Sequence, residues 1–166
     1  MSEVHIPTAR CLITAERSLL DLAADIYPLH APELAEKIEG ILGEGSTFHE
    51  THGYYAQGVG PETAVLPAGW MSRVHRVQTE TTNGRVGYCL EVTDLFMSKA
   101  VAGREKDRLF CIALLTHGYV KLESALALVS SMPLDQAARR RLSAAIRRWA
   151  KAIEEPHPSV TPFSQS

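Results

Sequence analysis

The chain changes its periodicity near Thr93, and this change limits the folds that are open to it. Residues 54–92 form short segments rich in valine and tyrosine, separated by glycines, prolines and the pair Asn83-Gly84. Such segments are typical of β-strands, and an Asn-Gly pair between two of them indicates a hairpin. In residues 93–153 the apolar side chains recur every three or four positions, which is the period of helices. We therefore expect an α+β fold, in which helices cover a small mixed sheet.

The same signals predict the individual elements. Strands are expected at 23–29, 53–59, 63–67, 73–79 and 86–92. Helices are expected at 10–22, 32–43, 93–103, 104–117, 121–131 and 134–153. With 166 residues, the chain has the length of one domain. We divide it into an α+β core at 1–118, a helical extension of the same domain at 119–153 and a flexible tail at 154–166.

The sequence "DLFMSKAVAGREKDRLF" places two charged residues among apolar ones. Lys99 lies at helical spacing from Leu95, and Asp107 lies at the same spacing from Cys111. In an unbroken helix Lys99 and Asp107 would be about 12 Å apart. A bend at Gly103 would bring them closer.

Two interpretations of this pair are open. In the first, Lys99 is a cation that binds phosphate, and Asp107 orients it or acts as a second acidic residue of a site. In the second, the pair is structural: a buried ion pair that joins two helices, or a lysine that covers apolar surface and reaches water with its tip. Spacing alone favours the structural interpretation.

Asp25 lies inside the apolar segment "AADIYPL". A buried carboxylate costs several kcal/mol unless it is paired, protonated or bound to a cation. One interpretation makes Asp25 a ligand of a divalent cation, because hard cations prefer carboxylate oxygens. The other makes it a residue at the end of a strand that caps a backbone group or pairs with an arginine. From the sequence alone the second is favoured.

The segment "FHETHGYY" carries further polar and aromatic candidates. His49, Glu50 and His52 lack the spacing of the helical zinc motif, so we expect no zinc site there. Tyr54 and Tyr55 are expected to pack against the core, with one ring lining a pocket.

Charge and cysteine content exclude several classes of function. The formal charge is -2, so no global basic field attracts nucleic acid, and the arginine-rich run at 139–151 is expected to be a solvated helix face. The three cysteines have neither metal nor disulfide spacing, which favours the reducing cytoplasm, and Cys89 and Cys111 are expected to be core thiols. No apolar run approaches the roughly 18 residues that span a bilayer, and the N-terminus lacks a signal-peptide pattern.

From about Ala24 to Tyr119 the chain resembles a bacterial family of nucleotidyltransferase-like proteins. The family is akin to the abortive-infection toxin nucleotidyltransferases of toxin–antitoxin systems. The matching segments are "ADIYPLHAPE", "GEGSTFHETHGYYAQGVGPETAVLPAGW", "CLEVTDLFMSKAVAGREKDRLFCIALL" and "HGYV", which together cover more than half of the chain. Such proteins look like members of the polymerase-β-type nucleotidyltransferase superfamily.

The resemblance implies a site for phosphoryl-transfer chemistry. In that superfamily a Gly-Ser or Gly-Gly pair precedes an acid-x-acid pair on a strand, and carboxylates hold Mg²⁺, which aligns the triphosphate. A lysine in a "DL…K" helix and an aspartate in an "R-x-K-D" segment complete the site in the toxin relatives. The implied residues of this chain are, for catalysis, Asp25, Lys99 and Asp107; for nucleotide binding, Lys99, Arg104 and Tyr55; and for Mg²⁺, Asp25 and Glu91.

The chain also departs from the family pattern. The strand and Gly-Ser helix expected before Asp25 are missing, and Ala23 stands at the first acidic position. The resemblance therefore implies a shortened member, for which three functions are open. One is the transfer of a nucleoside monophosphate from a nucleoside triphosphate to RNA, such as tRNA, or to protein. Another is nucleotide binding or regulation by a catalytically degenerate protein of the toxin–antitoxin type. The third is a self-associating scaffold, such as a homodimer, whose sheet is completed by a partner chain.

Overall fold

A computed structural model describes residues 4–6, 23–29, 31–80 and 86–154. Its centre is a five-stranded mixed sheet with the strand order β3-β2-β1-β5-β4. The strands are β1 (Val4–Ile6), β2 (Ala23–Pro28), β3 (Tyr55–Gly58), β4 (His75–Val77) and β5 (Gly87–Cys89). The pairs β1–β5 and β2–β3 are parallel, whereas β1–β2 and β4–β5 are antiparallel. The fold is α+β, as the sequence predicts.

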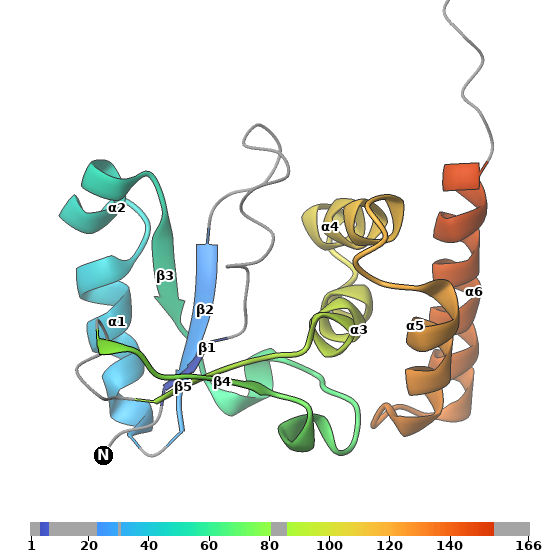
Figure 1. The fold of residues 1–166 in the computed structure, drawn as a ribbon, viewed down its shortest axis with the longest axis horizontal. Helices are drawn as coiled ribbons and strands as arrows, with labels where there is room; N and C mark the ends of the chain where they lie inside the picture. Colours follow the sequence, from blue (N-terminus) through green and yellow to red (C-terminus); the bar gives the residue numbers. More distant parts are fainter. Residues whose placement is uncertain (1–3, 7–22, 30, 81–85, 155–166) are drawn as a thin grey trace, which may run out of the picture.

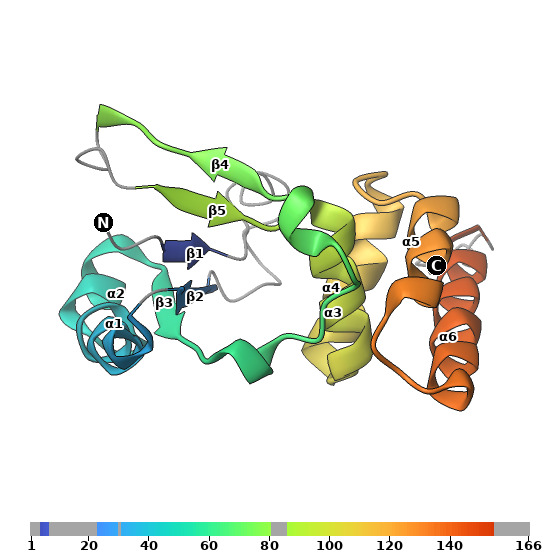
Figure 2. The ribbon, with the colours of Figure 1, turned by 90° about the horizontal axis from the view of Figure 1, so that it is seen from below.

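In the described part of the chain, six α-helices flank this sheet on two sides. Two short helices, α1 (Ala35–Leu42) and α2 (Thr47–His52), connect β2 to β3 and lie at one end of the molecule (Figure 1). The others form a helical layer at the opposite end: α3 (Val92–Ala102), α4 (Glu105–Thr116), α5 (Leu122–Leu128) and α6 (Gln136–Glu154). In both views α3 and α4 lie between the sheet and the outer pair α5 and α6 (Figures 1 and 2).

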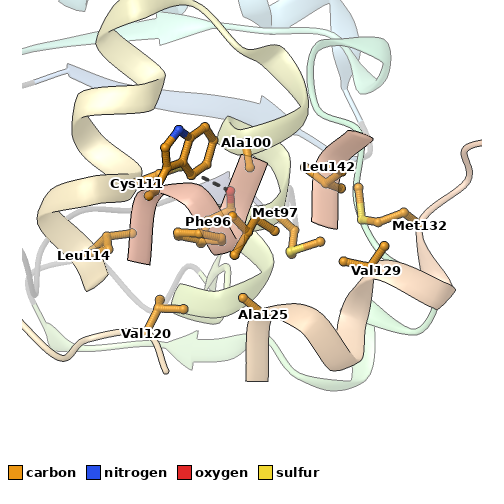
Figure 3. Packing of buried hydrophobic residues seen from close by; sticks show 12 residues of the cluster. Phe96, Met97, Ala100, Cys111, Leu114, Val120, Ala125, Val129, Met132 and Leu142 are labelled. Carbon is orange, nitrogen blue, oxygen red and sulfur yellow. Dashed lines mark hydrogen bonds between the residues drawn. The ribbon is translucent and has the colours of Figure 1, made fainter. Parts of the chain in front are cut away.

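The main hydrophobic core lies within the helical layer. Its central side chains come from these helices and from the segment that joins α5 to α6. They include Phe96, Met97, Leu114, Met132 and Ile146, which are nearly or completely inaccessible to solvent (Figure 3). Complete burial of such a side chain contributes about 1.5–3 kcal/mol each to the free energy of unfolding. Most residues of α3 are buried, because this helix has neighbours on several sides. The helix that carries Lys99 is therefore held firmly by the other helices of this layer.

Local signals explain where α3 begins and ends. Glu91 is the N-cap, and its carboxylate accepts a hydrogen bond from the backbone N–H of Thr93 at 2.7 Å. At the other end Gly103 has a φ of 66°, in the left-handed region that glycine adopts without strain, and its N–H donates to the carbonyl of Lys99. The chain then turns into α4, which begins at Glu105. The bend expected at Gly103 is confirmed.

Most of the sequence-predicted elements are confirmed, although the strands are shorter than expected. Two expectations are wrong. The strand expected to be missing before Asp25 is present as β1, which pairs with β2. The strand expected at 63–67 is absent, because that segment continues from a short 3-10 helix, η2 (Pro61–Thr63), into a loop. The pairing of β4 with β5 confirms the hairpin, but its turn, Asn83-Gly84, lies outside the described residues. Also outside them are Cys11, the helix expected at 10–22 and residues 155–166 of the expected tail. In the described part of the chain, no helix has the length and apolar character needed to cross a bilayer.

Candidate functional site

Three charged side chains from separate elements meet at the boundary between the sheet and the helical layer. The ammonium Nζ of Lys99 on α3 lies 3.3 Å from Oδ2 of Asp25 on β2 and 3.9 Å from Oδ1 of Asp107 on α4. Lys99 donates a hydrogen bond to Asp25, whereas its longer separation from Asp107 is that of an ion pair. The structure therefore brings together the three residues that the sequence analysis selected as catalytic candidates.

The ends of two helices place Lys99 and Asp107 near each other. Lys99 is in the last turn of α3, where the backbone carbonyls favour a cation, and Asp107 is in the first turn of α4, where the backbone amides favour an anion. The left-handed turn at Gly103 joins these two ends. Asp25 reaches the pair from the middle of β2, where it is opposite Gln57 of β3 in the register. The site thus depends on where α3 lies relative to β2, since Lys99 and Asp25 come from these two elements.

Arg104 completes the charge cluster. Its Nε donates to Oδ2 of Asp107 at 2.6 Å, and its Nη2 donates to Oδ1 at 3.3 Å. This two-point contact with Asp107 raises the pKa of the Arg104 guanidinium, and the charge of Asp25 contributes to the same shift. The cluster consequently holds two cations and two carboxylates, with Asp107 shared between Lys99 and Arg104.

Access to solvent differs among the four side chains. Asp107 is 3% exposed, Lys99 and Asp25 are 26% and 27% exposed, and Arg104 is 60% exposed. A buried carboxylate of this kind needs its partners, and Asp107 has two cationic ones. Lys99 keeps N–H groups beyond the one that it donates to Asp25, because an ammonium carries three. The two cations can therefore bind an anion from solvent while Asp107 holds them in place.

The carboxylates provide a partial set of ligands for Mg²⁺. Asp25 and Asp107 both reach the same ammonium, and Mg²⁺ is commonly held by one or two carboxylates together with phosphate oxygens and water. Glu91, the other predicted ligand, is the N-cap of α3 and its carboxylate is bonded to Thr93. Among the described residues, no three histidine, cysteine or acidic side chains gather as a ready-made metal site. The two aspartates fit Mg²⁺ only if a ligand supplies further oxygens.

Tyr55, the predicted nucleotide-binding aromatic residue, begins β3 and is only 5% exposed. Its ring lies 4.9 Å from that of His49, so Tyr55 belongs to the packing between α2 and the sheet. His49 itself accepts a hydrogen bond at Nδ1 from the backbone N–H of Gly45. The ring of His52 instead packs on Phe48. The histidines of this segment have local packing partners.

Sequence reasoning missed a fully buried carboxylate on the same helix as Lys99. Asp94 has no exposed surface, and Arg73 binds it at two points, from Nε at 2.8 Å and from Nη2 at 2.7 Å. This hydrogen-bonded contact with Asp94 raises the pKa of Arg73. The pair ties the first turn of α3 to the loop after a short 3-10 helix, η3 (Trp70–Ser72).

Cys111 lies close to the cluster but is not part of it. Its side chain is completely buried, and its Sγ–H donates to the carbonyl of Phe96 at 3.6 Å (Figure 3). Burial, followed by the charge of Asp107, raises the pKa of this thiol to about 12. Cys111 is therefore a neutral core thiol, as predicted, whereas Cys89 is only partly buried.

Comparison of the chain with known protein families, with curated proteins and with solved structures finds no match.

Proposed function

We propose that the cluster of Asp25, Lys99, Arg104 and Asp107 binds the phosphates of a nucleoside triphosphate, and that the protein transfers the nucleoside monophosphate to RNA or protein. The observation that carries this proposal is the position of Lys99, whose ammonium is within 4 Å of carboxylates from β2 and from α4. Lys99 and Arg104 bind the phosphate oxygens in this scheme. Asp25 would hold Mg²⁺ together with phosphate oxygens and water, and Mg²⁺ would offset the charge of the triphosphate.

A purely structural ion-pair cluster accounts less well for the same geometry. Ion pairs that stay open to water contribute little to stability, and Lys99 and Asp25 each keep about a quarter of their surface exposed, while Arg104 keeps more than half. Exposed charges contribute little to stability, but they are available to a ligand. Asp107 is the exception, and its burial suits a residue that orients the two cations.

A catalytically degenerate nucleotide-binding protein, of the regulatory or toxin–antitoxin type, is the second candidate. It is favoured by Ala23, which precedes Asp25 by two positions on β2 and leaves that strand with one carboxylate. A single strand carboxylate is a weak anchor for Mg²⁺ in transfer chemistry, whereas phosphate binding by Lys99 and Arg104 needs no second one. In either case we propose the cytoplasm as the compartment, where Cys89 and Cys111 remain thiols.

A labelling experiment distinguishes the two candidates. The purified protein is incubated with Mg²⁺, nucleotides labelled at the α-phosphate, and either total tRNA or cell extract. Transfer predicts label in a macromolecule for the wild type and loss of that label in Asp25→Asn and in Lys99→Met. Glu36→Gln, which removes an exposed carboxylate from the distant helix α1, serves as the control and should label normally.

The remaining outcomes are equally informative. Nucleotide binding with no label in any acceptor supports the degenerate protein. Labelling that persists in both Asp25→Asn and Lys99→Met would contradict a role for this cluster in transfer.

A further inference from the structure

Helix α6 carries a disproportionate share of the positive charge. It contains six of the 17 lysines and arginines of the chain but only one of the 19 acidic residues. The six are Arg139, Arg140, Arg141, Arg147, Arg148 and Lys151. Because the whole chain has a formal charge of -2, the remainder is acidic and the positive charge is concentrated on this outermost helix (Figures 1 and 2).

The packing of α6 fixes which of its sides faces solvent. Leu142, Ile146 and Trp149 are buried against the rest of the helical layer. Arg140, Arg147 and Lys151 follow one another at intervals of seven and four residues, which places them in one row on the opposite side from Trp149. Arg140 and Arg147 are exposed. The row is about 16 Å long at 1.5 Å per residue.

An open groove of about 590 Å³ lies beside this row, between α6 and the segment of α5 and η5 (Val129–Ser131). Arg139, Arg140 and Arg147 line it together with Ser143 and Ala144, whose small side chains separate Arg140 from Arg147. Leu126, Val129 and Ala144 contribute apolar surface to the same groove. The guanidinium groups therefore lie along an open groove, where the backbone of a bound polymer can come close to α6.

The arginines of the groove differ in their contacts. Arg139 donates from Nε at 3.1 Å and from Nη2 at 2.7 Å to the carbonyl of Met132, which fixes its guanidinium at the wall of the groove. Within the described ranges, no carboxylate lies at ion-pair distance from Arg140 or Arg147. A solvated helix face of a folded domain usually alternates charges of both signs, and this one does not.

We infer that the groove and the Arg140–Arg147–Lys151 row bind the sugar–phosphate backbone of a polynucleotide. The row is about 16 Å long, and successive phosphates of one strand are spaced about 3.4 Å apart along a duplex axis, so the row can contact several phosphates. Guanidinium groups pair with phosphate oxygens at two points, and α6 uses five arginines and one lysine.

This inference concerns a surface separate from the Lys99 cluster and does not depend on nucleotide binding there. Binding of a labelled RNA of about 20 nucleotides, long enough to cover the row, is measured by fluorescence anisotropy without nucleotide or Mg²⁺. The wild type is compared with the double variant Arg140→Gln, Arg147→Gln. A matched control, Lys37→Gln with Arg76→Gln, removes two exposed cations from α1 and β4, so the change in net charge is identical.

We expect the groove variant to weaken RNA binding at least roughly tenfold and to reduce the slope of log affinity against log salt by about 1.5, because two phosphate contacts are lost. The charge-matched control and Lys99→Met should bind RNA as the wild type does. Duplex RNA and duplex DNA run in parallel identify which polynucleotide is preferred, and circular dichroism verifies that each variant keeps its helices.

Three results would overturn the inference. The first is no RNA binding by the wild type at micromolar protein, and the second is an equal loss in the groove variant and the charge-matched control. The third is binding of polyglutamate as tight as RNA with the same dependence on Arg140 and Arg147, which would assign the surface to an acidic protein partner.

Discussion

The ammonium of Lys99 lies 3.3 Å from the carboxylate of Asp25, although the two residues are 74 positions apart in the sequence. This contact joins α3 of the helical layer to β2 of the sheet. Both side chains are about a quarter exposed, so water screens the attraction between them. The ion pair therefore lies where the sheet and the helical layer come together at the surface, and it contributes little to holding them together.

The coupling between Lys99 and Asp25 should accordingly be small. We predict an interaction energy below about 1 kcal/mol in a double-mutant cycle of Lys99→Met and Asp25→Asn, because exposed ion pairs contribute that much or less. Urea unfolding of the four proteins gives this value. A coupling of about 3 kcal/mol or more, the scale of a buried pair, would support a structural role for the cluster.

The pair of Arg73 and Asp94 should behave in the opposite way. We predict that Arg73→Met lowers the free energy of unfolding by about 3 kcal/mol, because it leaves the buried carboxylate of Asp94 without its partner. Asp94→Asn should cost less, since Arg73 is about one-third exposed and can turn toward water. Urea unfolding of the two variants and the wild type measures both changes in the free energy of unfolding.

A surface pair provides the control for that measurement. Arg108 and Glu105 form an ion pair on the exposed side of α4, and Arg108→Met should leave stability unchanged within error. If Arg73→Met changed the free energy of unfolding as little as Arg108→Met does, the prediction that buried Asp94 needs its partner would be wrong.

The turn at Gly103 should tolerate a side chain poorly. Gly103→Ala forces a side chain into the left-handed region at φ 66°, which costs about 1–2 kcal/mol, although an added Cβ meets no closer neighbour than the carbonyl of Val101 at 3.7 Å. Gly40→Ala is the control: Gly40 lies inside α1 with open space around it, so alanine should stabilise by about 0.5–1 kcal/mol. Thermal unfolding of both variants measures the two effects. Equal effects at the two positions would contradict the conformational argument.

The thiol of Cys111 should make the protein less stable in alkali. Its pKa is raised by burial from 9.0 to about 12, so between these values the unfolded chain loses a proton that the folded chain keeps. The contribution of the buried thiol is complete below pH 9 and decreases as pH rises, by at most about 1.4 kcal/mol per pH unit. Urea unfolding at several pH values should therefore show a steeper loss for the wild type than for Cys111→Ala. Parallel curves for the two proteins would contradict this assignment.

The sequence predicts the helical layer well because the spacing of the apolar residues and the residues that end helices give the same boundaries there. Regular apolar spacing places all four helices from α3 to α6, and Gly103 separates α3 from α4 as expected. The segment 63–67 is different. Its composition is that of a strand, but it has Pro67 at its end and no strand partner among the described residues, so it remains a loop. Propensity alone cannot supply a partner, since strand pairing is set by the rest of the fold.

The candidate site could be predicted only in part. Lys99 and Asp107 can be identified from the sequence because each is a charged residue at a helix position where an apolar one is expected. Asp25 can be identified because it interrupts an apolar strand. Their convergence depends on how α3 and α4 are placed relative to β2, which is a tertiary property. Asp94 was missed for a related reason: α3 is buried on most of its surface, so no single face of the helix marks which polar residue is enclosed.

Calorimetric titration with ATP, CTP, GTP and UTP in the presence of Mg²⁺ tests the central claim most directly. Lys121 at the start of α5 is exposed, so Lys121→Met removes the same charge as Lys99→Met at a place away from the cluster. We predict that at least one nucleotide binds the wild type and Lys121→Met, and that Lys99→Met weakens this binding at least roughly tenfold, the loss of a charged hydrogen bond. If none of the four nucleotides binds the wild type, or if Lys99→Met binds as tightly as Lys121→Met, the Lys99 cluster is not a nucleotide site.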